Sequence, residues 1–259
     1  MGKTSLAWTW LHQDVFHLSE VMCPHGVLWW SFYEPEATLT LFLDQALSYV
    51  SSGTVNPQGM TSLYEKTQAL LALLQRHRIL LVLDGFERAL RAYANLNAAY
   101  QGNDAPPDAQ GNFRVCIDPH LGSFLRWLTA SPLSSKVLLT TRLLPRELDG
   151  LAGCQCEELM ALKTEDAMAF LRAQGVQGTR AETEALCALY GNHPLALRLL
   201  TGLIVNDPAR PTDVAVATDY HPLTELIQRE HHILSPRLQG KFAPFLESRP
   251  QAVALTWSI

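Results

Sequence analysis

Three short apolar runs constrain the fold of this 259-residue chain more than any other feature of its sequence. The runs are Val27–Phe32 (VLWWSF), Ile79–Leu83 (ILLVL) and Val137–Thr141 (VLLTT). Each run is nearly continuous rather than alternating, which is the pattern of a strand covered on both faces. Helical patterns separate the runs, so the sequence predicts an α/β fold with a parallel sheet.

The segments between the runs have helical periodicity. In residues 38–50 and 62–76 the apolar side chains fall on one helical stripe. Ser62 and Glu65 have the spacing of a capping box, which marks the start of the second helix. Residues 93–119 contain the turn-rich segment GNDAPPDAQGN and are predicted to form a surface loop.

The character of the chain changes after about Glu158, where only short helical patterns follow. One of these begins with a capping box, Thr179-x-x-Glu182, and another begins at Pro194, a residue that suits a first helical turn. We therefore expect the α/β part to be followed by a small helical part, with the boundary near residues 158–163.

Composition excludes several classes of protein. The chain is 47% hydrophobic with a net charge of −5, so it is neither disordered nor a basic protein that coats nucleic acid. Its five scattered cysteines are expected to be free thiols in a reducing compartment. No apolar run approaches the roughly 18–20 residues of a membrane span. We expect a cytoplasmic protein without membrane contact, and nothing in the sequence points directly to nucleic acid.

Met1 is followed by Gly2, Lys3, Thr4 and Ser5, and Gly-Lys-Thr is the back half of a phosphate-binding loop. In such a loop the lysine reaches the β- and γ-phosphates, the threonine hydroxyl binds Mg²⁺, and a helix begins so that its N-terminus faces the anion. The tripeptide is weak by itself, because it also occurs by chance.

Asp84 follows the ILLVL run directly, at the carboxyl end of a predicted strand, where open α/β sheets bind their ligands. A carboxylate there can hold Mg²⁺, and Glu87 three residues later can orient or deprotonate a water. The alternative is that Asp84 merely caps a helix that starts at Gly85, with Glu87 in its first turn.

Two further segments end or begin with side chains suited to a nucleotide. Arg142 follows the third run and can contact a γ-phosphate, although an arginine in that place is often only solvated. Asn192, His193 and Pro194 precede a predicted helix, where a rigid proline can pack against a flat base. The alternative is an ordinary helix N-terminus.

In this order, the four segments resemble the STAND class of P-loop NTPases, in particular its bacterial-type NB-ARC-like group. GKT at residues 2–4 is similar to the end of the Walker A motif, and ILLVLD ending at Asp84 to Walker B. LLTTR ending at Arg142 is similar to the sensor-1 segment, and NHPLA at residues 192–196 to the GLPLA motif. The chain departs from the pattern at Gly85, where plant and apoptotic members have a second aspartate, and at the first two residues of NHPLA.

The resemblance implies a three-layer P-loop NTPase domain over residues 1–160, a helical NB-ARC-type subdomain over 161–233 and the start of a winged-helix region over 234–259. The first strand and the front of the P-loop are missing, so the resemblance is to a chain truncated at both ends. We expect the missing strand to lie between the strands ending at Leu83 and Thr141. Both strands should then have an open edge, and nucleotide affinity should be millimolar at best.

The resemblance also implies a set of ligands and roles. Glu87 and Arg142 are expected to be catalytic, and Thr4 and Asp84 to hold Mg²⁺. The residues expected to contact ATP or ADP are Gly2, Lys3, Thr4, Ser5, Arg142, His193 and Pro194. The implied function is a regulatory switch that hydrolyses ATP slowly and assembles with other protein domains or with further copies of itself. The alternative is a non-catalytic interaction or scaffold module with a degenerate P-loop.

Overall fold

The structure, a computed structural model, describes residues 3–20, 22–94, 112–219 and 252–256. The chain forms two compact units: one contains residues 3–159 and 251–259, and the other residues 1–2 and 160–250. Most of the predicted winged-helix segment, 234–259, lies outside the described residues, apart from a strand at 252–256 that belongs to the first unit.

The three predicted parallel strands are confirmed. They are β1 (Gly26–Ser31), β2 (Ile79–Asp84) and β3 (Lys136–Thr141), and β2 pairs in parallel with both of the others. Every residue of β2 is buried, as its continuous apolar run predicts for a strand between two neighbours. Because the strands are parallel, their carboxyl ends meet at one edge of the sheet.

The expectation of a gap between the second and third strands is wrong. β2 and β3 pair directly, with Leu81 opposite Val137 and Leu83 opposite Leu139. This pairing satisfies the backbone N–H and C=O groups of two buried strands, which would be costly to leave without partners. The free edge expected for β2 is therefore absent, because β1 and β3 occupy its two sides.

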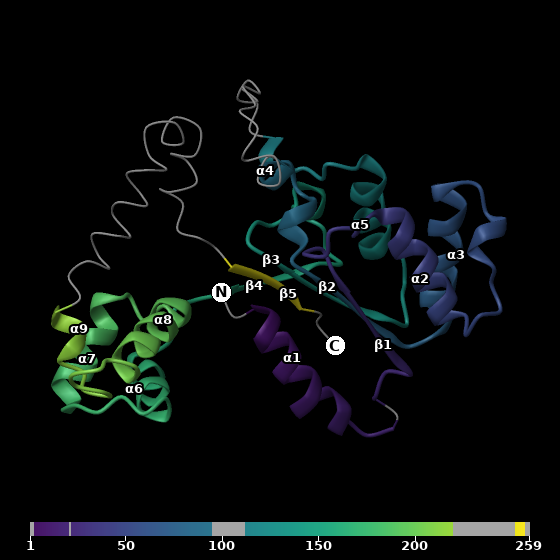
Figure 1. Ribbon diagram of the computed structural model, residues 1–259. Coiled ribbons are helices and arrows are strands. Elements are labelled where there is room, and N and C mark those ends of the chain that lie inside the picture. Colours follow the sequence, from purple (N-terminus) through teal and green to yellow (C-terminus); the bar gives the residue numbers. More distant parts are fainter. Residues whose placement is uncertain (1–2, 21, 95–111, 220–251, 257–259) are drawn as a thin grey trace. The chain divides into compact units, whose positions relative to one another are not determined.

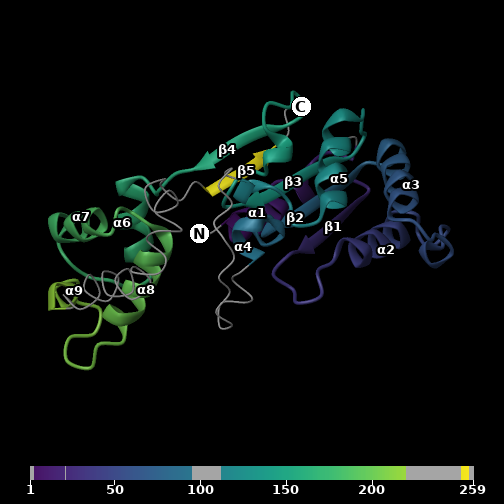
Figure 2. The ribbon, with the colours of Figure 1, turned by 90° about the horizontal axis from the view of Figure 1, so that it is seen from above.

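Two antiparallel strands extend the sheet beyond β3. β5 (Ala252–Thr256) pairs with β3, and β4 (Gln155–Leu159) pairs with β5. The strand order is therefore β1-β2-β3-β5-β4 (Figures 1 and 2), and the outer edge of β3 is also occupied. The fold of this unit is mixed α/β, with three parallel strands side by side.

Three helices cover one face of the parallel strands (Figure 1). These helices are α2 (Leu39–Val50), α3 (Leu63–Arg76) and α5 (Pro119–Ala130). Each begins at a side chain that accepts a backbone N–H: the Thr38 hydroxyl, the Ser62 hydroxyl and the Asp118 carboxylate. Fully buried side chains from the helices and from alternate strand positions form one core, which includes Phe42, Leu47, Leu74, Leu81, Leu83, Phe124 and Leu139.

Helix α1 (Lys3–Gln13) lies against the opposite face of the sheet (Figure 1). Its buried residues are Lys3, Ala7 and Leu11, spaced by four, so they form a narrow stripe along the helix. Ala7 and Leu11 pack with Leu80 and with neighbouring apolar side chains of β2 and β3. Because Lys3 belongs to the same stripe, packing of α1 brings its side chain to the sheet.

Short elements complete this unit. They are the 3₁₀ helices Val15–His17, Pro57–Gly59, Phe86–Ala89, Asn112–Arg114 and Arg146–Leu148, and the four-residue helix α4 (Arg91–Ala94). Of the predicted surface loop at 93–119, residues 95–111 lie outside the described residues.

The second unit is helical where it is described. It contains α6 (Thr164–Ala173), α7 (Arg180–Leu189), α8 (Pro194–Val205) and α9 (Val216–Asp219) around their own apolar core. The predicted capping box at α7 is confirmed, as is Pro194 in the first turn of α8. Within the described part of the chain, no helix combines the length and hydropathy that crossing a bilayer requires.

Ser135 should contribute measurably to stability, because its fully buried hydroxyl joins two segments. It accepts the N–H of Ile79 at 3.0 Å and donates to the carbonyl of His77 at 2.6 Å. In a Ser135→Ala variant the N–H at the start of β2 loses its partner, which should lower the free energy of unfolding by about 1–3 kcal/mol. Urea denaturation measures this loss.

The neighbouring Ser134 provides the control, because it is exposed and its hydroxyl also donates to a backbone carbonyl, that of Gln75. Ser134→Ala should cost less than about 1 kcal/mol, since water replaces the lost partner. Equal losses in the two variants would contradict the role assigned to Ser135.

Candidate functional site

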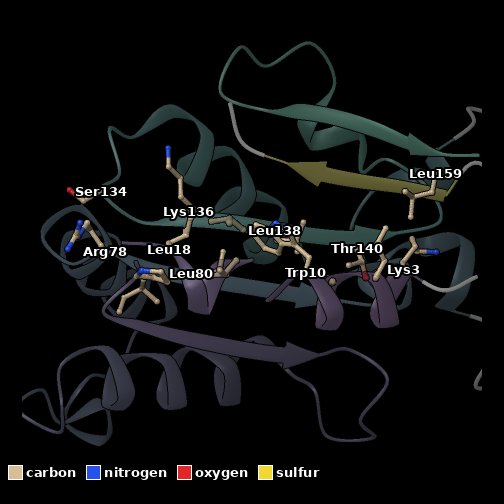
Figure 3. Close-up of a pocket in the computed structure, with 16 residues that line it drawn as sticks. Lys3, Trp10, Leu18, Arg78, Leu80, Ser134, Lys136, Leu138, Thr140 and Leu159 are labelled. Atoms are coloured by element: carbon tan, nitrogen blue, oxygen red, sulfur yellow. The ribbon is translucent and has the colours of Figure 1, made fainter. Parts of the chain in front are cut away.

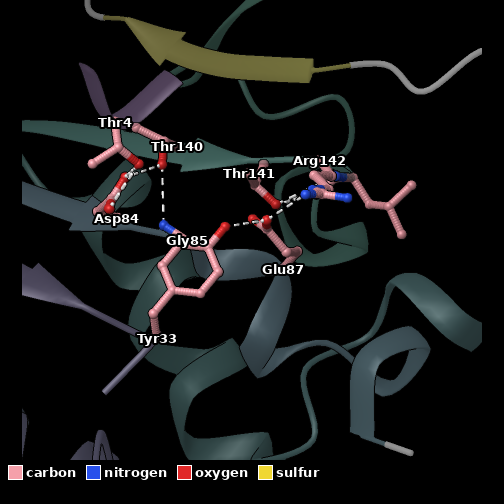
Figure 4. Close-up of polar contacts among 9 residues, drawn as sticks. Thr4, Tyr33, Asp84, Gly85, Glu87, Thr140, Thr141 and Arg142 are labelled. Carbon is pink, nitrogen blue, oxygen red and sulfur yellow. Dashed lines mark hydrogen bonds and ion pairs between the residues drawn. The ribbon is translucent and has the colours of Figure 1, made fainter. Parts of the chain in front are cut away.

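Asp84 is the centre of a polar cluster at the carboxyl ends of the parallel strands (Figure 4). Its side chain is 2% exposed and accepts hydrogen bonds from two hydroxyls. Thr4 donates to the two carboxylate oxygens, at 2.9 and 3.0 Å, and Thr140 donates to Oδ1 at 2.6 Å. The cluster therefore joins the first turn of α1, the end of β2 and the end of β3.

Thr140 has a second contact that fixes the turn after β2. Its hydroxyl oxygen accepts the N–H of Gly85 at 3.0 Å while its proton goes to Asp84. Sequence reasoning assigned no role to this residue, although a polar pair directly after the apolar start of β3 was visible. The alternative that Asp84 caps the following helix is not supported, because the cap residue of the Phe86–Ala89 helix is Gly85, with no side-chain cap.

Glu87 lies in that 3₁₀ helix and is also 2% exposed. The Tyr33 hydroxyl donates to its Oε1 at 2.7 Å, and the Arg142 Nε lies 3.3 Å from the same oxygen (Figure 4). The other oxygen, Oε2, is buried and has no hydrogen-bond partner among the described residues. A buried carboxylate oxygen without a partner is costly for stability, which marks Glu87 as a candidate for function.

Glycine is required at position 85 for two reasons. Its φ of 72° lies in the left-handed region, and a Cβ atom there would be 2.3 Å from Cε2 of Tyr33. The absence of a side chain lets the Tyr33 ring lie against the turn, from where its hydroxyl reaches Glu87. Any side chain at this position, a second aspartate included, would meet both constraints.

The ammonium group of Lys3 interacts electrostatically with the carboxylates of Asp84 and Glu87. Lys3 is 7% exposed, and burial lowers the pKa of its ammonium, while Glu87 raises it, Arg142 lowers it and Asp84 raises it. Lys3 is therefore a partly desolvated cation whose charge is balanced by the neighbouring carboxylates.

The structure thus brings together five of the predicted site residues: Lys3, Thr4, Asp84, Glu87 and Arg142. Ser5 is exposed on α1, one position beyond Thr4. Gly2 lies outside the described residues. His193 and Pro194 belong to the second unit, so they are described separately.

In the second unit, His193 is the cap of α8, and its Nδ1 accepts the N–H of Ala196 at 3.4 Å. Asn192 precedes it with a φ of 54°, which a residue other than glycine rarely adopts. The Asn192 amide nitrogen donates to the Thr164 hydroxyl at 3.3 Å, while its Oδ1 is buried without a partner among the described residues. This geometry is that of an ordinary helix N-terminus, which was one of the two interpretations of the sequence. Contact of Pro194 with a nucleotide base stays a prediction.

The donors around Asp84 fit a hard divalent cation only in part. Among the described residues, no group of three or more His, Cys, Asp or Glu side chains is placed to hold a metal. The hydroxyl of Thr4 and the carboxylate of Asp84 are oxygen ligands of the kind Mg²⁺ prefers, but they would supply at most two positions. Such a site fits a cation whose other ligands are water and phosphate.

A groove of about 450 Å³ lies beside the cluster, between α1 and β3 (Figure 3). It extends from Ser134 and Arg78 at one end to Lys3 and Thr140 at the other. Its lining is mostly apolar and includes Leu6, Trp10, Leu18, Leu80, Leu138 and Leu159. The groove exists because α1 buries only its narrow stripe and leaves part of this sheet face uncovered.

Gly85→Ala should destabilise the chain through both the backbone and the Tyr33 ring. The left-handed conformation costs about 1–2 kcal/mol for a residue with a side chain. The clash with Tyr33 should add roughly 1–3 kcal/mol, or displace the ring and break its bond to Glu87. Chemical denaturation measures the total.

Gly53 separates the two effects, because its φ is 79° and nothing lies within 4 Å of the place that a Cβ atom would take. Gly53→Ala should therefore show the backbone cost alone. If both variants lose the same free energy, the contact between Tyr33 and the turn does not have the importance assigned to it.

Comparison with known proteins adds no relatives. No family model matches the chain, and neither a curated protein nor a solved structure is significantly similar to it.

Proposed function

We propose that this chain is an ATP- and ADP-binding regulatory module, a nucleotide switch with slow ATP hydrolysis. The observation that carries the proposal is the contact between Thr4 and Asp84, two residues that lie 80 positions apart in the sequence and hydrogen-bond at 2.9 Å. A hydroxyl at the start of a helix beside a carboxylate at the end of a buried strand is the pair that a P-loop NTPase needs.

Phosphate recognition is assigned to the start of α1. Lys3 is the first residue of this 11-residue helix, whose N-terminal N–H groups and dipole favour an anion. Its side chain is nearly buried, so a phosphate oxygen would meet a cation that is poorly solvated by water. Ser5 would contribute its backbone N–H to the same anion.

Mg²⁺ would be held by the Thr4 hydroxyl and the Asp84 carboxylate, with phosphate oxygens and water as its other ligands. The ion would neutralise phosphate charge. Thr140 keeps Asp84 in place for this role, because it donates to Oδ1 and is itself fixed by the N–H of Gly85. The carboxylate is therefore oriented by a neighbouring strand of the sheet.

Glu87 and Arg142 are assigned to the reaction itself. Glu87 would orient or deprotonate the attacking water through a carboxylate that is almost fully desolvated. The Arg142 side chain is 43% exposed, so its guanidinium can turn toward a γ-phosphate and report its presence. ATP and ADP would then favour different arrangements of the pair, which is the basis of a switch.

Lys3→Met should weaken the millimolar binding of Mg·ADP and Mg·ATP expected of this chain roughly ten- to a hundredfold, until titration detects none, because a charge-assisted contact is lost. The same variant should not lower the melting temperature. The pKa of Lys3 is lowered on folding, so its charged form is disfavoured in the folded chain, and an apolar side chain of similar length removes that cost. Calorimetric titration and thermal melting of the same samples measure both quantities.

Lys163→Met is the matched control, because Lys163 is an exposed lysine of the second unit and the N-cap residue of α6. It should leave affinity and melting temperature unchanged. Equal nucleotide affinity in the unaltered chain and the Lys3→Met variant would refute the phosphate-binding role.

Glu87→Gln should leave nucleotide affinity intact and slow hydrolysis about 10²–10⁴-fold, since only the handling of the water proton is lost. Single-turnover assays with radiolabelled ATP provide the rate, and titration with Mg·ADP provides the affinity. Unchanged turnover in Glu87→Gln would show that a residue other than Glu87 is the general base.

The alternative, a non-catalytic interaction module, is favoured by one observation. Large apolar side chains are exposed on α1 and directly after it, at Leu6, Trp8, Trp10, Phe16 and Leu18. Such a patch is typical of a surface that contacts another protein. If neither ATP nor ADP binds, while Trp8→Ala lowers self-association or partner binding, this alternative replaces the nucleotide switch.

A further inference from the structure

We propose that Tyr33 is a positioning residue that holds the carboxylate of Glu87 in its catalytic orientation. The inference rests on the proposed function, because it concerns the base assigned there to ATP hydrolysis. Tyr33 comes two residues after Ser31, the last residue of β1, so the parallel pairing of β1 with β2 places it beside the turn that carries Glu87.

The two oxygens of Glu87 are in different situations. Oε1 accepts the Tyr33 hydroxyl at 2.7 Å and faces Arg142 at 3.3 Å, whereas the buried Oε2 has no partner among the described residues. A carboxylate held by one oxygen cannot rotate without breaking a charge-assisted hydrogen bond. Oε2 is therefore the oxygen whose lone pairs are unused among the described residues.

Arg142 cannot perform this positioning alone. Its side chain is 43% exposed and is assigned to the γ-phosphate, so it would leave Glu87 at the moment when ATP is bound. The hydroxyl of Tyr33 is neutral, so phosphate attracts it less strongly than it attracts the charged guanidinium of Arg142. Its hydroxyl is the contact that remains on Oε1 when the arginine turns away.

The surroundings of Tyr33 keep its hydroxyl in place and protonated. The ring lies against Gly85, the guanidinium of Arg88 lies over it at 5.4 Å, and the backbone N–H donates to the Ser31 hydroxyl at 3.3 Å. Burial, followed by the bond to Glu87, raises the pKa of the Tyr33 hydroxyl above its ordinary value, so it remains a donor. A protonated hydroxyl is what the hydrogen bond from Tyr33 to Oε1 of Glu87 requires.

The test is a double-mutant cycle on the 259-residue chain with Tyr33→Phe, Glu87→Gln and both together. Tyr33→Phe removes one oxygen atom and keeps the ring. It should lower single-turnover ATP hydrolysis roughly ten- to a hundredfold and leave the affinity for Mg·ADP unchanged, because only orientation is lost. In the Glu87→Gln background the same substitution should have no further effect, since it acts only through that carboxylate.

Tyr49→Phe is the matched control. Tyr49 and Tyr33 are each 46% exposed, and the Tyr49 hydroxyl also has a hydrogen bond, but it accepts the backbone N–H of Val27 at 3.1 Å. Its loss is purely structural and should leave turnover unchanged. Melting temperatures of the two phenylalanine variants show whether either substitution disturbs folding.

Three outcomes count against the inference in different ways. Normal turnover in Tyr33→Phe overturns it while leaving the nucleotide switch intact. An equal loss from Tyr33→Phe in the otherwise unaltered chain and in the Glu87→Gln background also overturns it, because Tyr33 then acts by another route. If the unaltered chain shows no nucleotide binding or hydrolysis at all, the proposed function and this inference fall together.

Discussion

The hydrogen bonds of Asp84 are the interaction on which the rest of the site depends. They join Thr4, in the first turn of α1, to Thr140, which lies in β3 and comes 56 residues after Asp84 in the sequence. Parallel pairing makes this possible, because it places the ends of β1, β2 and β3 at one edge of the sheet. Each further group is positioned relative to Asp84, including the turn at Gly85 whose N–H is held by Thr140.

Three ionisable side chains near this edge are almost fully buried: Lys3, Asp84 and Glu87. Burying charge costs free energy unless each group is paired and hydrogen-bonded, and Glu87 has an oxygen that has no partner among the described residues. A chain selected for stability alone would replace such groups with apolar residues of similar size. Their presence in the interior of this α/β unit is the physical argument that the edge of the sheet has a function.

Much of the central unit could be predicted from the sequence, because continuous apolar runs and helical stripes depend on local patterns. The meeting of Asp84, Glu87 and Arg142 also follows from parallel strands that end at one edge. Lys3 and Thr4 lie on α1, so their place at this edge was expected only from the resemblance. Tyr33 and Thr140 could not be assigned in this way, since a single tyrosine or threonine at a strand end has no distinctive spacing. Local sequence patterns also could not predict which strands pair with one another. The pairing of β2 with β3, and of β3 with β5, depends on residues that lie far apart in the chain.

The position of β5 has a consequence for the order in which the sheet forms during synthesis. β4 ends at Leu159, but its only neighbour among the described strands is β5, which begins at Ala252. A ribosome adds about 5–20 residues per second, so β4 waits several seconds or more for its partner to be translated. The helices α6 to α9 are all made within that interval. Assembly of the sheet is therefore expected to be sequential, with β1, β2 and β3 forming early and the antiparallel pair closing last.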